Sequence, residues 1–332
     1  MGTIDAGHIL VARGEVPEKC PPRLSVTSVA ESVSNFADAS QTLIILDWDD
    51  TLFPTTELFD RWLLPSKPQQ WCDLHLRSEQ ESALAPWREA LSLYMRRICM
   101  LSTRVVIVTN SKPGWVENTV KKFAPDLQDL FAEPGGVRVV YASEAMRACV
   151  RLSAGSLGGT PVLLADQSPT QQEFDDNLIR AKFHAMQREA TEFYSQYPGQ
   201  TWKNIICVGD AEYEHFAAQD LAFRRRGPDH EKLRLKCIIT PEAPLLRDMI
   251  YRLSITTLLW PSYVAHDGDM DVDMNTPQQL GAVAQALGMP LELQTKIRHF
   301  PISEEDLKHL AEDLEEVTAL MDDQLMDCRA GA

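Results

Sequence analysis

An apolar run that leads directly into a cluster of acidic residues most constrains the fold of this chain. Four consecutive aliphatic residues at 43–46 predict a strand that is buried on both faces, as the strands of a parallel sheet are. The carboxylates of Asp47, Asp49 and Asp50 follow at its C-terminal end, which is where ligands bind in open α/β sheets. A solvated acidic turn is the structural interpretation. A site that binds a cation or presents a nucleophile is the functional one.

Further apolar runs alternate with segments of helical periodicity along much of the chain. Strands are expected at 104–110, 137–141, 204–210 and 233–239, with a short extra strand at 161–165. Helices are expected at 79–100, 113–123, 143–150, 171–197 and 212–224. This alternation predicts an α/β fold with a doubly wound parallel sheet. The carboxyl ends of parallel strands share one rim, so Thr109 and Asp210 are expected beside Asp47 and Asp49.

Two prolines and a serine indicate where three of the helices begin. Pro86 would suit the first turn of the helix at 79–100, because that turn does not use the backbone N–H that proline lacks. Pro241 is expected to open a helix after the last predicted strand. Ser111 is a candidate N-cap for the helix at 113–123.

The chain divides by composition into three parts. Residues 1–40 have weak periodicity and predict a loose N-terminal extension. Residues 41–262 predict the main α/β domain, in which the proline-containing segment 53–78 leaves room only for a small cap or flap. Residues 263–332 predict an acidic connector followed by C-terminal helices, which would pack on the main domain or on a protein partner.

The acidic run at 267–273 resembles a calcium-binding EF-hand loop only superficially. Met274 stands at the position that requires glycine, and Leu280 stands where the last acidic ligand is needed. A solvated connector or an edge strand is therefore expected here.

The composition argues against several classes of protein. The formal net charge of −16 over 332 residues disfavours a nucleic-acid binder, which needs clustered Lys and Arg. No apolar run reaches the ~18–20 residues of a membrane span. The first residues lack the basic and apolar regions of a secretory signal. Seven cysteines without a CxxC pair indicate neither a disulfide framework nor a zinc site, so a cytoplasmic protein is expected.

Four short motifs follow one another in a consistent order. They are Asp-Trp-Asp-Asp-Thr at 47–51, Thr109 after the second strand, a helical lysine, and Gly-Asp-Ala-Glu-Tyr-Glu at 209–214. Lys182 is the first candidate for the lysine and Lys203 the second. Over roughly residues 43–240 the chain thus resembles the haloacid dehalogenase-like (HAD) hydrolase superfamily, whose first and fourth motifs are DxDx[TV] and GDxxx[DE]. The surroundings of its second and fourth motifs are similar to an uncharacterised eukaryotic HAD-like group.

This resemblance implies a Rossmannoid phosphatase, a phosphoric monoester hydrolase that acts through an aspartyl-phosphate. Asp47 would attack phosphorus as the nucleophile. Asp49 would protonate the leaving group and then activate water. Asp50 stands where the superfamily commonly has glycine, and a helix-capping or supporting role is expected for it.

The resemblance also implies a magnesium ion and a phosphate-binding set. Mg²⁺ would be held by Asp47, the backbone carbonyl of Asp49, and Asp210, with Glu214 placed to orient a metal-bound water. The phosphoryl oxygens would be bound by Thr109, Asn110 and Lys182.

Alternatives remain open for the residues and for the function. Thr109 would also serve as a helix cap, Glu214 as a surface acid of a helix, and Lys182 as a solvated lysine. A catalytically degenerate scaffold would bind a phosphorylated ligand or a protein partner without turnover. A phosphotransferase would pass the phosphoryl group to an acceptor other than water. The small cap favours an open site, which suits a phosphoprotein as well as a small phosphorylated molecule.

Overall fold

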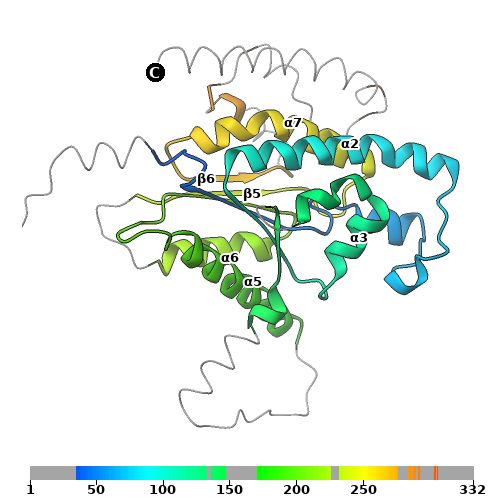
Figure 1. The fold of residues 1–332 in the computed structure, drawn as a ribbon, viewed down its shortest axis with the longest axis horizontal. Coiled ribbons are helices and arrows are strands. Elements are labelled where there is room, and N and C mark those ends of the chain that lie inside the picture. Colours follow the sequence, from blue (N-terminus) through cyan, green and yellow to red (C-terminus); the bar gives the residue numbers. More distant parts are fainter. Residues whose placement is uncertain are drawn as a thin grey trace, which may run out of the picture. The chain divides into compact units, whose positions relative to one another are not determined.

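A six-stranded sheet in which every strand is parallel to its neighbours organises the fold (Figure 1). In spatial order the strands are β3 (Arg138–Tyr141), β2 (Arg104–Thr109), β1 (Thr42–Leu46), β4 (Asn204–Gly209), β5 (Arg234–Ile239) and β6 (Met270–Asp273). β1 lies between β2 and β4, and Ile45 is in register with Val106 and Cys207. The predicted parallel α/β sheet is confirmed, and the acidic run that follows β1 emerges from the interior of the sheet.

The computed structural model describes residues 35–132, 136–146, 170–225 and 232–275, with isolated positions between 283 and 305. The chain divides into two compact units, Met1–Asn35 and Phe36–Ala332, and the strands and helices named here belong to the second. The predicted strand at 161–165 lies outside the described residues, as do most residues of the predicted C-terminal helices. Within the described residues, no helix combines the length and the apolarity needed to cross a membrane.

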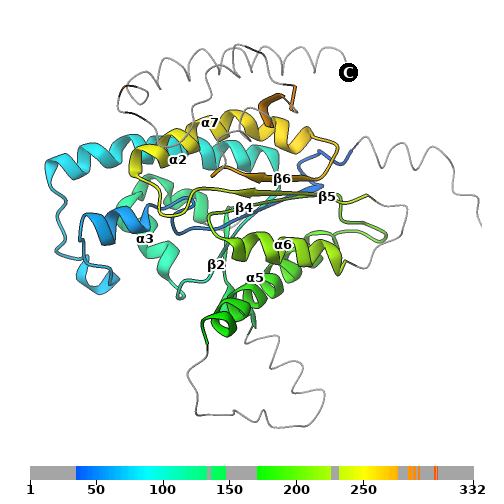
Figure 2. The ribbon, with the colours of Figure 1, turned by 180° about the vertical axis from the view of Figure 1, so that it is seen from behind.

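Helices cover both faces of the sheet (Figures 1 and 2). They are α2 (Ser78–Leu101), α3 (Trp115–Phe123), α5 (Gln171–Phe193), α6 (Glu212–Phe223) and α7 (Leu246–Ala265). Ile44 and Leu46 of β1 belong to the core formed with α2, α3 and α7, whereas Leu43 and Ile45 belong to the core formed with α5 and α6. Side chains alternate across a strand. A strand covered on both faces is therefore apolar at every position, which explains the unbroken apolar run.

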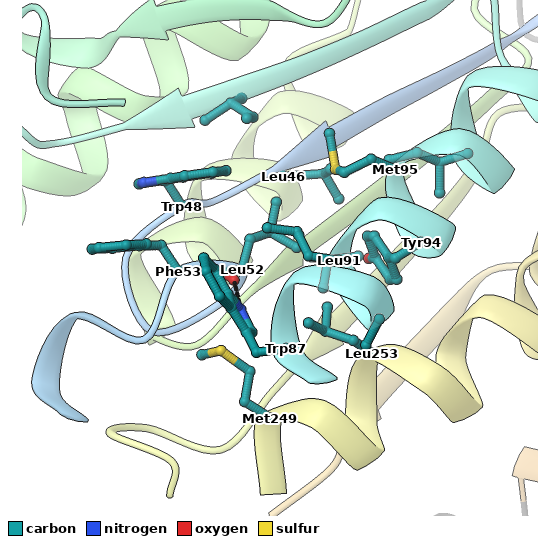
Figure 3. Packing of buried hydrophobic residues seen from close by; sticks show 14 of the residues in the cluster. Leu46, Trp48, Leu52, Phe53, Trp87, Leu91, Tyr94, Met95, Met249 and Leu253 are labelled. Carbon is teal, nitrogen blue, oxygen red and sulfur yellow. Dashed lines mark hydrogen bonds between the residues drawn. The ribbon is translucent and has the colours of Figure 1, made fainter. Parts of the chain in front are cut away.

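Large aromatic side chains anchor the loop that follows β1. The rings of Trp48 and Phe53 stack with centroids 5.9 Å apart and an interplanar angle of 3°. Trp87 of α2 donates its indole N–H to the carbonyl oxygen of Leu52 at 3.0 Å (Figure 3). All four side chains are at most 1% exposed. Burying a Phe-sized side chain contributes about 1.5–3 kcal/mol to the free energy of folding. These buried side chains therefore fix the position of the loop.

Three predicted helix starts are wrong. Pro86 lies inside α2, well beyond its first turn; its missing bond leaves the carbonyl of Ser82 without a helical donor, and both residues are exposed. α3 is preceded by Gly114 at φ 83° and has no side-chain cap, so Ser111 is not its N-cap. α7 begins at Leu246, so Pro241 does not open it.

The segment 53–78 and the acidic run at 267–273 both contain defined structure. In the segment 53–78, which we call the flap, a short π-helix (Glu57–Arg61) and a 3₁₀ turn (Pro68–Gln70) precede α2. At the other end, β6 pairs with β5, so the sheet continues beyond residue 262, where the domain was expected to end. Of the two interpretations of the acidic run, the edge strand is the one found: Val272 is buried and Asp271 is exposed.

Candidate functional site

Three of the predicted site residues follow neighbouring strands at one rim of the sheet. Asp47 follows β1, Thr109 ends β2 and Asp210 follows β4. The backbone N–H of Asp47 donates to the carbonyl oxygen of Val208 at 2.9 Å, so the pairing of β1 with β4 extends to the acidic residue itself. Because these strands are adjacent and parallel, the structure brings their C-terminal ends together.

Lys182 reaches this rim from the interior of α5. Its ammonium lies 2.5 Å from Oδ1 of Asp47 and also contacts the carboxylate of Glu214. The lysine is only 2% exposed, so it is not the solvated lysine of the structural interpretation. Lys203, the second candidate, precedes β4 at the opposite end of the strand, roughly 20 Å from Asp210 at 3.3 Å per residue. Lys182 is thus the candidate that contacts the acidic residues.

Glu214 lies in the first turn of α6 and points back toward the rim. Its Oε2 accepts a hydrogen bond from the backbone N–H of Ala211 at 3.2 Å, and its Oε1 faces Lys182. Gly209 makes this approach possible, because a Cβ at that position would lie 2.4 Å from Cγ of Glu214. Glu214 is buried, so it is a partner of Lys182 and not an acid on the surface of the helix.

The carboxylate of Asp49 is held by three side chains. Oδ1 accepts hydrogen bonds from the Thr55 hydroxyl at 2.6 Å and from the indole N–H of Trp115 at 2.8 Å. Oδ2 accepts one from the Ser111 hydroxyl at 2.6 Å. The three donors come from the flap, the loop after β2 and the start of α3. The predicted N-cap serine therefore orients Asp49 instead of capping a helix.

Asp50 has a structural role in the same loop. Its carboxylate accepts hydrogen bonds from the backbone N–H of Thr56 at 2.9 Å and from the Thr56 hydroxyl at 2.5 Å. Its φ of 51° lies in the left-handed region, where glycine is unstrained and Asp is tolerated. This conformation gives a physical reason for glycine to suit the position. Burial raises the pKa of the Asp50 carboxyl, and the hydrogen bonds from Thr56 oppose that rise.

Negative charge is concentrated between Asp47 and Asp210. Burial, together with the charge of the neighbouring Asp47, raises the pKa of Asp210 to about 7. Burial also raises the pKa of Asp47 to about 6, against the opposing charge of Lys182. Within the described residues, the Asp210 carboxylate accepts one hydrogen bond, from the Thr51 hydroxyl at 3.2 Å. These two carboxylates therefore lack full charge compensation from the protein.

Arg252 of α7 binds the backbone of the acidic loop. Its guanidinium donates to the carbonyl oxygens of Asp50 at 3.1 Å and of Thr51 at 2.5 Å, and the residue is 3% exposed. Burial lowers the pKa of Arg252 to about 10, and the charge of Asp210 opposes that change. No sequence motif pointed to this residue.

The two remaining phosphate-binding candidates are at the end of β2. Thr109 is 1% exposed, and its hydroxyl accepts a hydrogen bond from the backbone N–H of Ser111 at 3.0 Å. The hydroxyl thus shapes the loop that carries Ser111. Asn110 follows it and is half-buried.

Comparisons with models of protein families, with curated proteins and with solved structures found no match to this chain.

A divalent cation fits part of the predicted ligand set. Asp47 and Asp210 offer hard oxygen donors and uncompensated negative charge, which suit Mg²⁺. Glu214 does not fit as a ligand, because Lys182 and the N–H of Ala211 engage its two oxygens. Among the described residues, no group of three or more His, Cys, Asp or Glu side chains is placed to hold a metal ion. Mg²⁺ often uses only one or two carboxylates together with water, so this finding does not conflict with a two-carboxylate site.

Proposed function

We infer that this chain is a magnesium-dependent phosphatase of the HAD-like type, with a doubly wound Rossmannoid fold and Asp47 as its nucleophile. The observation that carries the proposal is the buried Asp47 carboxylate, which is bound by Lys182 at the sheet rim with Asp49 two residues further on. Burying a carboxylate and a lysine costs desolvation free energy, which can exceed the stability that their attraction contributes. A phosphoryl-transfer site gives both groups a use.

The reaction proceeds in two steps that this chain's own residues perform. In the first, a carboxylate oxygen of Asp47 attacks phosphorus, the bond from phosphorus to the leaving oxygen breaks, and Asp49 gives its proton to that oxygen. In the second, Asp49 takes a proton from water as the water oxygen attacks phosphorus. The bond from phosphorus to Asp47 then breaks, and inorganic phosphate leaves. Lys182 stays beside Asp47 and offsets negative charge throughout.

Mg²⁺ would be held by Asp47, Asp210 and the backbone carbonyl of Asp49. When bound, it supplies the positive charge that allows an anionic phosphate to approach a carboxylate nucleophile. Glu214 contributes through Lys182, whose ammonium it contacts.

The test is the variant Asp47→Asn with p-nitrophenyl phosphate as substrate and Mg²⁺ present. A carboxamide is a poor nucleophile, so turnover should be abolished while the circular dichroism spectrum stays that of the wild type. Asp60→Asn is the matched control, because Asp60 is an exposed acid of the flap and its loss should leave turnover unchanged. Full activity in Asp47→Asn would refute the mechanism.

One observation favours the second candidate function, a scaffold that binds a phosphorylated ligand without turnover. Lys182 already contacts both Asp47 and Glu214, so these two carboxylates share a cationic partner in the absence of a metal. A panel of small phosphate esters and phosphopeptides separates the two functions. Release of phosphate that requires Mg²⁺ identifies the enzyme and indicates its substrate class. Saturable binding of a panel member without phosphate release identifies the scaffold.

A further inference from the structure

The two oxygens of the Asp49 carboxylate have different surroundings. A carboxylate oxygen offers two lone pairs to donors. Thr55 and Trp115 occupy both positions on Oδ1, whereas Ser111 is the one donor to Oδ2 among the residues that the structure describes. One lone pair of Oδ2 is thus left for exchange with a substrate or with water.

The three donors also differ in what they can exchange. A hydroxyl can turn and accept a hydrogen bond, but an indole N–H only donates. When Asp49 takes up a proton, the hydroxyls of Thr55 and Ser111 can adapt, while Trp115 still requires an acceptor at Oδ1. The two donors on Oδ1 therefore favour Oδ2 over Oδ1 as the oxygen that carries the proton.

Aromatic packing fixes the direction of this indole N–H. The ring centroid of Trp115 lies 5.7 Å from those of Phe59 and Trp71 in the flap. Phe59 and Trp71 in turn stack on each other, with an interplanar angle of 2°. Phe53 meets the same indole edge-on, with centroids 6.4 Å apart. Such contacts restrict how an aromatic ring can turn, so Trp115 holds Asp49 from a rigid support.

We propose that Trp115 is a positioning residue for Asp49, which holds the carboxylate so that protons are given and taken at Oδ2. The inference rests on the proposed phosphatase function and adds to it the atom that carries the proton and the residue that selects this atom. In the first step, the proton on Oδ2 moves to the leaving oxygen as its bond to phosphorus breaks. In the second, Oδ2 receives the proton of the attacking water.

The chemistry of the leaving group reports on this placement. A p-nitrophenolate leaves without a proton, whereas a phenolate without the nitro group benefits strongly from one. Substituted phenyl phosphates have nearly the same shape, but their leaving groups differ in how much they need a proton from the enzyme. The slope of log kcat/KM against the pKa of the leaving phenol therefore measures how well Asp49 delivers its proton.

The test compares this slope in the wild type, Trp115→Phe and Trp71→Phe. Phenylalanine keeps an aromatic ring but removes the N–H, so Trp115→Phe should steepen the slope and lower kcat/KM for phenyl phosphate relative to p-nitrophenyl phosphate by about tenfold. Trp71→Phe is the matched control, because it keeps an aromatic ring beside Trp115 and removes an indole N–H whose acceptor is the carbonyl oxygen of Pro65 and not Asp49. Its slope should equal that of the wild type.

A second variant covers the case in which Trp115→Phe does not fold. Thr55→Val removes the other donor to Oδ1 with little change in volume and should steepen the slope in the same direction. Asp49→Asn sets the upper limit of the effect. A wild-type slope in Trp115→Phe and Thr55→Val, or an equally steep slope in Trp71→Phe, would overturn the positioning role while leaving the phosphatase proposal intact. Absence of turnover of every ester by the wild type would instead overturn the phosphatase proposal and this inference with it.

Discussion

At the scale of single residues, the site depends on which side chains can approach one another. Lys182 meets Asp47 and Glu214 in a buried position, and each contact requires its partner to be charged and close. Removing one member of such a group leaves an uncompensated buried charge, which is more costly than losing the whole group. Small residues next to this group therefore matter as much as the charged ones.

Gly209 is the residue where this dependence can be tested. In Gly209→Ala, the new Cβ would lie 2.4 Å from Cγ of Glu214, so Glu214 has to move away from Lys182. We expect a loss of about 1–3 kcal/mol in the free energy of unfolding, together with reduced phosphatase activity. Urea denaturation and steady-state kinetics measure the two effects.

A double-mutant cycle provides the control for this prediction. The three atoms closest to the new Cβ belong to Glu214, and two of them are absent in a Glu214→Ala background. Gly209→Ala should therefore lower the free energy of unfolding by less in that background. Equal costs in both backgrounds would show that the glycine acts independently of Glu214.

At the scale of elements, the acidic loop is held by parts of the chain that are far apart in sequence. α2 contributes Trp87 to the carbonyl oxygen of Leu52, and α7 contributes Arg252 to the carbonyl oxygens of Asp50 and Thr51. The two helices pack against each other on the same face of the sheet (Figure 2). The loop is thus supported by a packed pair of helices and not by its own turn alone.

Arg252→Met should show how much α7 contributes. Methionine keeps much of the volume but removes the hydrogen bonds to Asp50 and Thr51 and leaves both carbonyl oxygens without this donor. We expect a loss of about 2–4 kcal/mol in the free energy of unfolding, since hydrogen bonds from charged groups contribute about 1.5–3 kcal/mol each. Urea denaturation gives the value.

Arg247→Met is the control on the same helix. The Arg247 side chain is 36% exposed and its nearest contact to Asp248 is long, at 3.9 Å. We expect a change within about 0.5 kcal/mol for this variant. Similar losses for the two arginines would contradict a specific role for Arg252.

At the scale of the whole sheet, the end opposite the site carries a second buried polar group. Lys236 of β5 is fully buried and donates to Oδ1 of Asn204 at 2.7 Å and to the carbonyl oxygen of Val264 at 3.1 Å. Asn204 also donates to the Thr42 hydroxyl and to the same carbonyl oxygen of Val264. This network joins β1, β4, β5 and α7 at the N-terminal ends of the strands.

Lys236 predicts a pH dependence of stability. Burial and the charge of nearby Arg234 lower its pKa from the ordinary 10.5 to about 7, although Asp267 and Asp269 oppose the change. Between these two pKa values the unfolded chain binds more protons than the folded one, so the free energy of unfolding rises with pH. The slope from this one group is at most about 1.4 kcal/mol per pH unit.

The measurement compares the wild type with Lys236→Met between pH 7.5 and pH 9, roughly the middle of the window. The lost hydrogen bonds shift the stability of the variant by a similar amount at every pH, so only the difference in slope is informative. The wild type should gain stability relative to the variant as pH rises. Parallel profiles, or a relative loss, would show that Lys236 keeps its proton in the folded protein.

The sequence predicted the features that depend on local pattern. The apolar runs that end in Asp47, Thr109 and Asp210 were enough to place these residues at one rim, because parallel strands share that geometry. The spacing around Lys182 placed it on a helix, but its burial depends on how α5 packs on the sheet.

The features that were missed depend on contacts between distant segments. Arg252 lies 202 residues from Asp50, and no local pattern indicates that α7 passes beneath that loop. Trp115 and Ser111 contact Asp49 only because α3 and the loop before it fold back over the flap. Pro86 was misplaced because a proline in an exposed part of a helix can leave its unbonded carbonyl to water.

The order of the strands has a consequence for how the protein forms during synthesis. β1 is synthesised early, but one of its edges pairs with β4. Thr42 can therefore pair with Asn204 only after a further 162 residues have been synthesised. Contacts of such long range slow folding, and an unpaired strand edge is prone to pair with other chains. A nascent chain that ends before β4 therefore exposes its most apolar strand. The carboxylate of Asp47 reaches its final position only after β4 has paired with β1.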